Sequence, residues 1–179
     1  MNKHDEKEKL MDEVLNKDRS FKNIYNDSLD INVSRCKLGL AIVMLARGIP
    51  FIHSGQEFLR TKLMVENSYN ASEEINKLDW NRRIVFDNVM EYFKSLVLLR
   101  KQIIGVLNDD KAYVTSRNYY DTIVCQIEDL IIFTNASANS YDYSDEYKYN
   151  VLLDYNGNKE NDVSALKIMP YSLLVAKRV

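Results

Sequence analysis

The sequence predicts an α+β protein in which helices come first and an antiparallel β-sandwich follows. Two stretches with helical spacing of apolar residues support this, one over residues 31–46 and one from Phe86 to Ile104. After Gly105 the pattern changes to short segments rich in β-branched and aromatic residues. We therefore expect two domains, with residues 1–110 mainly helical and residues 111–179 all-β.

The first predicted helix has one apolar face, made by Leu38, Ala41, Ile42 and Leu45 at i, i+3, i+4 and i+7. Gly48 suits the left-handed position that ends a helix, and Pro50 prevents the helix from continuing. The stretch "IPFIH", residues 49–53, follows at once. Because it is too short for a helix and too apolar for a loop, it predicts a buried strand.

A long polar segment, Thr61 to Arg83, separates this strand from the second helix, and loops of that length are uncommon unless they have a function. In the last third, "TIVCQIEDLIIFTNA" predicts a tight hairpin and the whole of residues 111–179 predicts a small antiparallel sandwich. Residues 1–29 are charged and weakly periodic, which leaves open one or two helices or a poorly ordered arm. One strand cannot make a parallel sheet, so the first half is incomplete as an α/β unit.

Composition excludes several classes of partner. The chain of 179 residues carries 24 basic and 26 acidic residues with no block of one sign, which argues against nucleic acid and anionic membranes. The longest apolar run, "LGLAIVMLA", is about half of a membrane span. The charged start lacks a signal-peptide pattern, so a cytoplasmic location is expected for the chain as given. With no phosphate loop, zinc motif, dinucleotide fingerprint or calcium loop, we expect no metal and no cofactor.

Candidate ligand-binding residues gather in two places. His53 ends the predicted strand, with Gln56 and Glu57 just beyond it, and ligands of α/β sheets collect at the carboxyl ends of strands. The alternative is a plain strand end with a satisfied buried histidine. Next, "NSYN" (residues 67–70) offers amides that can hydrogen-bond sugar hydroxyls and an aromatic face, although an ordinary polar loop has the same composition.

Two further features carry less information. The dipeptide His4–Asp5 has the chemistry of a catalytic pair but lies in a charged terminal segment. Trp80 is the only tryptophan, and we expect it to anchor the point where the long segment rejoins the core rather than to serve as a stacking platform.

The stretches "GIPFIHSGQEFLRTK" and "NSYNASEEINKLDWNRR" together closely resemble the end of the catalytic barrel in type I pullulanases, debranching enzymes of the α-amylase superfamily. The resemblance covers about residues 34–179. It implies that "LGLAIVMLARG" is the seventh barrel helix, "IPFIH" the eighth strand and "FDNVMEYFKSLVLLRKQ" the eighth helix. The implied fold is the last helix–strand–helix portion of a (β/α)8 barrel followed by the β-sandwich.

The resemblance also implies a reaction, the hydrolysis of α-1,6-glucosidic bonds in pullulan, starch or glycogen with retention of configuration. Retaining glycosidases need a carboxylate nucleophile and a carboxylic general acid. In the family these lie on the fourth and fifth barrel strands, and nothing in this sequence matches their motifs. "KHDEKEKLMDEV" is similar to the family's third-carboxylate motif, with Asp5 as the carboxylate and His4 beside it, although Glu6 stands where the family has asparagine and the following Leu-x-Asp arrives a residue late.

The remaining residues of the two stretches acquire roles by the same resemblance. Gln56, Glu57 and Arg60 are expected to line or brace the substrate cleft, although Glu57 and Arg60 can also pair with each other at i, i+3. The residues expected to contact glucose units are Asn67, Tyr69 and Asn70. The implied partners are an α-glucan polysaccharide and the missing N-terminal part of the barrel.

Without a nucleophile and a general acid, the chain alone is expected to be inactive. Three alternatives stay open: a non-catalytic α-glucan-binding module, a truncated product or subunit that complements a separate N-terminal half, and an unrelated α+β protein that shares two motifs by chance.

Overall fold

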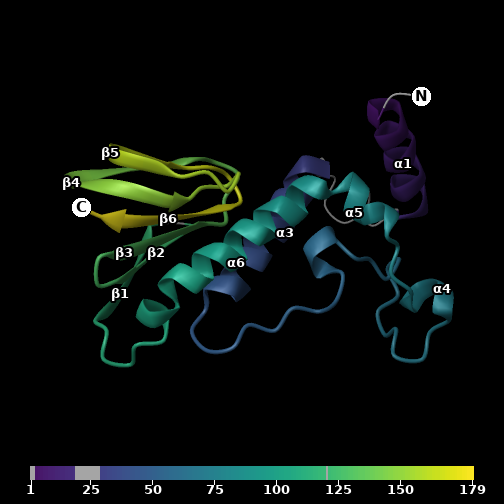
Figure 1. Ribbon diagram of the computed structural model, residues 1–179, viewed down its shortest axis with the longest axis horizontal. Helices are drawn as coiled ribbons and strands as arrows, with labels where there is room; N and C mark the ends of the chain where they lie inside the picture. Colours follow the sequence, from purple (N-terminus) through teal and green to yellow (C-terminus); the bar gives the residue numbers. More distant parts are fainter. Residues whose placement is uncertain (1–2, 19–28, 120) are drawn as a thin grey trace. The chain divides into compact units, whose positions relative to one another are not determined.

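The computed structural model of the protein describes residues 3–18, 29–119 and 121–179 (Figure 1). These residues form two compact units. The loop unit comprises the described residues up to 33 together with 52–90, and the sheet unit comprises residues 34–51 together with 91–179. The predicted division into domains at residue 110 stays a prediction.

The loop unit contains short elements joined by long turns. Its elements are α1 (Lys3–Lys17), the start of α3 (Leu29–Leu45), the 3-10 helix η1 (Gln56–Phe58), α4 (Glu73–Asn76), α5 (Asn81–Val85) and the start of α6 (Asp87–Leu107). Acidic residues in the first turn of α1 and Lys17 in its last turn suit the helix dipole. Of the undecided segment 1–29, the structure therefore shows one helix, and residues 19–28 lie outside the described residues.

The two long helices predicted from the sequence are confirmed as α3 and α6. In the sheet unit, the buried Arg100 of α6 closes the end of α3 by donating to the carbonyl oxygens of Met44 (2.5 Å), Ala46 (2.9 Å) and Gly48. These are carbonyls that a helix end leaves without intrahelical partners. Gly48 has a φ of 86°, as its predicted left-handed position requires.

Six strands form one antiparallel sheet in the described part of the sheet unit: β1 (Val114–Tyr119), β2 (Thr122–Ile127), β3 (Leu130–Asn135), β4 (Tyr141–Leu153), β5 (Glu160–Ile168) and β6 (Ser172–Arg178). The spatial order is β1-β2-β3-β6-β4-β5, and the predicted hairpin is β2–β3. The sequence did not reveal β5, because most of its side chains are polar and exposed.

The expected two-sheet sandwich is replaced by a single sheet that folds over itself (Figure 1). Tyr119 of β1 stacks on Tyr141 of β4 with ring centroids 5.8 Å apart, although these strands are not neighbours. The rings of Phe133 in β3 and Tyr143 in β4, which are also not neighbouring strands, are tilted with their centroids 4.9 Å apart. The enclosed core consists of Val124, Ile131, Phe133, Tyr149, Val151, Leu166, Ile168, Leu174 and Ala176.

The other face of the sheet is also covered. Leu130, Ile132, Leu173 and Val175 alternate with the enclosed core residues and are buried. From α3, Arg35 donates to the hydroxyl of Tyr171 (3.2 Å), and Lys37 donates to the carbonyl of Tyr155 (2.5 Å). These contacts attach the helices to the turns of the sheet.

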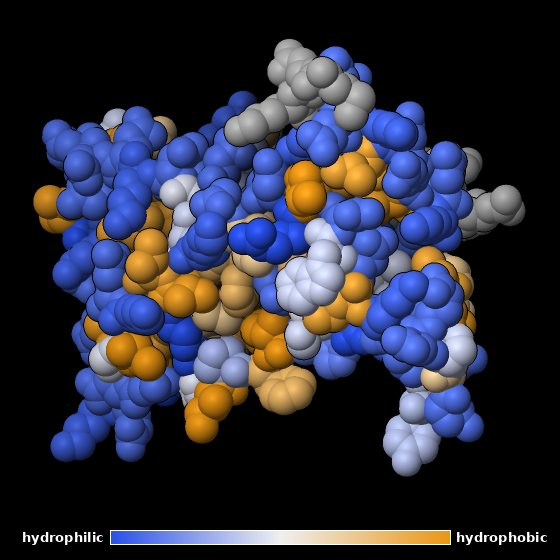
Figure 2. Space-filling view, turned by 45° about the vertical axis from the view of Figure 1, so that its right-hand side comes forward, coloured by the Kyte–Doolittle hydropathy of each residue, from blue (hydrophilic) through white to orange (hydrophobic). Residues whose placement is uncertain are grey.

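The strand expected at residues 49–53 is absent, and this expectation was wrong for the chain as described. Ile49 is 97% exposed and Phe51 is 83% exposed. A strand exists only by hydrogen-bonding to neighbours, and no other described segment pairs with this one. In the view of Figure 2, apolar side chains reach the surface among polar ones, as these exposed fractions imply.

Candidate functional site

The turn after residue 53 is built by side chains that fold back on its own backbone. The Gln56 amide oxygen accepts a hydrogen bond from the N–H of His53 (3.3 Å), and the Glu57 carboxylate accepts one from the N–H of Gly55 (3.0 Å). Gly55 has a φ of 91°, and a Cβ there would lie 2.8 Å from Leu78. The turn therefore requires glycine, and the Gln56 and Glu57 side chains hold its shape.

Arg60 braces this turn against a distant part of the unit. Its Nη1 donates to the carbonyl of Ser54 (3.2 Å) and lies 3.4 Å from Nε2 of His53, while its Nη2 donates to the carbonyl of Asn76. Glu57 accepts from the N–H of Gly55, and Arg60 bonds to backbone carbonyls; their expected part in lining or bracing a substrate cleft stays a prediction.

The predicted sugar-contacting loop is shaped by Asn76, a residue the sequence reasoning missed. Its Nδ2 donates to the carbonyls of Ser68 (2.9 Å) and Ala71 (3.0 Å), and its Oδ1 accepts from Nζ of Lys62 (2.5 Å). The signal that could have found Asn76 was weak: it lies eight residues after Ser68, inside the same motif.

The three residues predicted to contact sugar lie at the tip of the loop and differ in their hydrogen bonds and exposure. Asn67 uses its Oδ1 to accept from the N–H of Tyr69 (3.2 Å), so part of its capacity serves the turn. Tyr69 is 93% exposed, and Asn70 is also exposed. The structure thus exposes both an aromatic ring and an amide on two consecutive residues of the tip.

Three residues near this site have strained backbone angles. Leu59, Leu63 and Met64 have positive φ angles of 59°, 51° and 68°, which cost free energy for residues other than glycine. The buried Arg82 supports Leu59, because its Nε donates to the Leu59 carbonyl (2.7 Å). Arg82 also forms an ion pair with Asp18 at 3.1 Å, with both side chains at most 2% exposed.

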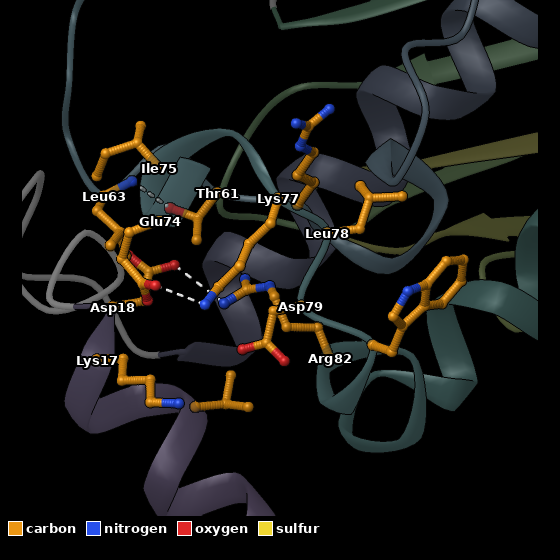
Figure 3. Close-up of a pocket in the computed structure, with 13 residues that line it drawn as sticks. Lys17, Asp18, Thr61, Leu63, Glu74, Ile75, Lys77, Leu78, Asp79 and Arg82 are labelled. Carbon is orange, nitrogen blue, oxygen red and sulfur yellow. Dashed lines mark hydrogen bonds and ion pairs between the residues drawn. The ribbon is translucent and has the colours of Figure 1, made fainter. Parts of the chain in front are cut away.

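A pocket of about 190 Å³ lies beside Arg60 in the loop unit (Figure 3). Its walls include Val14, Lys17 and Asp18 of the α1 end, Thr61 and Leu63, and the stretch from Glu74 to Arg82. Figure 3 shows Lys77 reaching toward Glu74, with which it pairs at 2.5 Å. The hydrogen bond from Lys77 lowers the pKa of the Glu74 carboxyl. The volume is below the ~300–1,000 Å³ of ordinary small-molecule sites.

Trp80 lines this pocket instead of anchoring the core. Its side chain is 62% exposed, and its ring lies 5.5 Å from that of Phe58 at an interplanar angle of 34°. The expectation of a buried anchor was wrong, because Phe58, which is 2% exposed, fills that place. Of the predicted site residues, only Arg60 lines the pocket.

The predicted pair His4–Asp5 lies in the first turn of α1. Asp5 is exposed and does not line the pocket, and the side chain of His4 lies outside the described residues. Within residues 3–18, 29–119 and 121–179, no three His, Cys, Asp or Glu side chains gather to hold a metal ion. None of the helices in those ranges is both long and apolar enough to span a membrane.

Comparison with known proteins gives a consistent result. No family model matches the chain. The pullulanase of Bacillus subtilis is 36% identical over 150 residues, which covers 75% of this chain and 21% of that protein. Pullulanase 1 of Arabidopsis thaliana is 39% identical over 57 residues, covering 30% of this chain and 6% of the relative. The chain thus spans about a fifth of the length of the Bacillus relative.

Several solved structures similar to this chain are also pullulanases. The pullulanase of Anoxybacillus sp. LM18-11 complexed with maltotriose superposes with a TM-score of 0.75 at 28% identity, over 86% of this chain and 24% of that one. The pullulanase of Bacillus acidopullulyticus, at 22% identity, supports the fold alone, with a TM-score of 0.77 over 94% of this chain and 22% of that one. The chain is therefore similar, over most of its own length, to one part of the pullulanases.

Proposed function

We propose that this chain supplies the C-terminal part of an enzyme that hydrolyses α-1,6-glucosidic bonds in pullulan, starch or glycogen. The observation that carries the proposal is the loop at residues 67–70, which presents Tyr69 and Asn70 to solvent from a braced support. Solved pullulanases to which the chain is similar were crystallised with maltose, maltotriose or maltotetraose. An exposed tyrosine beside an amide suits such ligands, because the ring packs on sugar C–H groups and the amide binds hydroxyls.

In this proposal α3, residues 49–53 and α6 are the last helix, strand and helix of a (β/α)8 barrel. Segment 49–53 becomes a strand once parallel neighbours are present on both sides, which would bury Ile49 and Phe51. The free energy of that burial is about 25 cal/mol per Å² of apolar surface. The side chains of Gln56, Glu57 and Arg60 then shape the wall that follows this strand, as they already shape the turn.

The two groups that form and break bonds, the nucleophile and the general acid, are assigned to residues outside this sequence. Asp5, with His4, remains the proposed transition-state-stabilising carboxylate, and the nucleophile and general acid come from earlier barrel strands. We therefore expect no release of reducing sugar from pullulan by the purified chain, with Asp5→Ala as the comparison. Turnover that survives purification and falls in the Asp5→Ala variant contradicts this assignment.

Binding is tested separately from turnover. Titration of the chain with maltotriose, followed by calorimetry, is expected to show saturable binding that is weakened in Tyr69→Ala. Tyr113→Ala serves as the control, because Tyr113 is also largely exposed (72%) but lies before β1. Equal binding by wild type and both variants contradicts the assignment of the 67–70 loop.

A second candidate, a subunit that completes a separately made N-terminal half, is favoured by the exposure of Ile49 and Phe51. Co-expression with Bacillus subtilis pullulanase truncated before the region matched here is expected to restore pullulan hydrolysis. The double variant Ile49→Ser, Phe51→Ser is expected to abolish that restoration. Failure of the wild-type chain to bind or activate the truncated enzyme contradicts this second candidate.

A further inference from the structure

We infer that Asn76, together with Arg60, is a positioning residue that fixes Tyr69 for contact with a glucose unit. This inference rests on the proposed function, because it concerns how the 67–70 loop is held. Neither residue needs to touch the sugar. Asn76 acts through the backbone of the loop, and Arg60 acts through the backbone of Asn76.

The side chain of Asn76 is fully used in shaping the loop. Both hydrogens of an amide NH2 can be donated, and here they go to the carbonyls of Ser68 (2.9 Å) and Ala71 (3.0 Å). These carbonyls flank Tyr69 and Asn70 on either side. The amide therefore clamps the two ends of the exposed tip at one point.

Two cations fix the clamp itself. The Asn76 carbonyl accepts from Nη2 of Arg60, and its Oδ1 accepts from Nζ of Lys62 at 2.5 Å. Because donors that carry charge form stronger hydrogen bonds than neutral ones, Asn76 is held more firmly than the loop that it holds. Arg60 also reaches Ser54, so the same guanidinium links the 53–60 turn to the loop support.

The tip itself adds two hydrogen bonds, from the Tyr69 N–H to Oδ1 of Asn67 and from the Ala71 N–H to the Ser68 carbonyl, both at 3.2 Å. The α4 helix that ends at Asn76 has four residues and no buried side chain, and Tyr69 is 93% exposed. A loop without buried apolar contacts adopts one conformation only if hydrogen bonds hold it. Pre-ordering of a binding loop improves affinity, because less conformational entropy is lost on binding.

The test is the variant Asn76→Asp. It keeps the size of the side chain and an acceptor for Lys62, but a carboxylate cannot donate to Ser68 and Ala71. The matched control is Asn88→Asp, which makes the same change of charge in the loop unit and keeps the acceptor that Val89 N–H uses. Amide hydrogen exchange is expected to speed up by about 10-fold or more at residues 68–71 in Asn76→Asp and to be unchanged in Asn88→Asp.

A double-mutant cycle on maltotriose affinity then separates positioning from a general loss of structure. Asn76→Asp is expected to weaken binding by about 10-fold in the wild-type chain and by almost nothing in the Tyr69→Ala background, since it acts through Tyr69. Equal effects in both backgrounds, or unchanged exchange at residues 68–71, overturn the inference. If the wild-type chain does not bind maltotriose at all, the proposed function fails, and the exchange measurement still decides whether Asn76 orders the loop.

Discussion

The sheet and the stretch of chain from residue 49 to residue 80 keep their shapes by different means. In the sheet, neighbouring strands hydrogen-bond each other's backbone groups. Nine core side chains are enclosed where the sheet folds over itself. In the stretch from 49 to 80, hydrogen bonds from long polar side chains to the backbone replace regular pairing, as those of Arg60 and Asn76 do. The first region is held by strand pairing and an enclosed core, whereas the second is a set of braced turns with Ile49 and Phe51 exposed at its start.

The largest effect on the free energy of unfolding is expected from a cavity in the sheet core. Phe133→Ala removes a fully buried ring that packs on Tyr143, and should lower the free energy of unfolding by about 4 kcal/mol. Far-UV circular dichroism should detect the loss. The fluorescence of Trp80, the only tryptophan, reports the loop unit, so its transition should shift less if the two regions are independent. Equal shifts of both signals would show one cooperative unit.

A slightly smaller effect is expected in the loop unit. Arg82→Met removes the ion pair with the buried Asp18 and the bond to the Leu59 carbonyl, at a cost of about 3 kcal/mol. Urea unfolding followed by Trp80 fluorescence measures it. The control is Lys7→Met, which breaks the more exposed pair with Asp87 and should cost less than about 1 kcal/mol. Similar losses in the two variants contradict the assigned difference in burial.

The sheet should also respond to pH through one carboxylate. Burial alone would raise the pKa of Asp145, but hydrogen bonds from the hydroxyl of Tyr149 (2.6 Å), from the N–H of Tyr147 and from the hydroxyl of Tyr143 lower it overall. A lowered pKa in the folded state means that the contribution to stability is present above the unfolded value of about 3.9 and is lost as the pH falls below it.

The difference in unfolding free energy between wild type and Asp145→Asn should therefore shrink as the pH falls from 7 toward 3. Circular dichroism in urea at several pH values measures this difference. A difference that stays constant over that range means that the carboxylate is not stabilised by its tyrosine partners.

The smallest effect on stability is expected at the start of the braced stretch. The double variant Ile49→Ser, Phe51→Ser should change the unfolding free energy of the chain by no more than about 0.5 kcal/mol, because both side chains are almost fully exposed. Thermal unfolding followed by circular dichroism checks it, with Phe58→Ser as a buried comparison expected to destabilise strongly. A large loss in the double variant means that these residues pack within the chain.

The sequence predicted the helices and the hairpin well, because these depend on local patterns. Apolar spacing located α3 and α6, and alternating β-branched residues located β2 and β3. Segment 49–53 was misjudged for the opposite reason, since a parallel strand depends on neighbours that its own residues do not encode. The sandwich was expected because strand patterns do not reveal how one sheet folds over itself.

The sequence pointed to residues of the candidate site, but not to which of them are exposed and which hold turns. Tyr69 was expected to face a ligand and is exposed, whereas Asn67 and Gln56 are partly used to hold turns. Asn76 was missed, because its importance comes from where its amide group donates and accepts across the loop, and the residue sequence alone does not reveal those partners. Trp80 was expected to be buried, but its neighbour Phe58 is the buried ring. The spacing of two aromatic residues along the chain does not indicate which of them is buried.

The strand order has a consequence for how the chain is made. β6 lies between β3 and β4, so among the described strands it alone joins the β1–β3 meander to the β4–β5 hairpin. Both parts are synthesised before residues 172–178, and until β6 pairs with them each has an unpaired edge and half of an apolar core. A nascent chain is therefore most prone to aggregation and most in need of a chaperone just before β6 emerges.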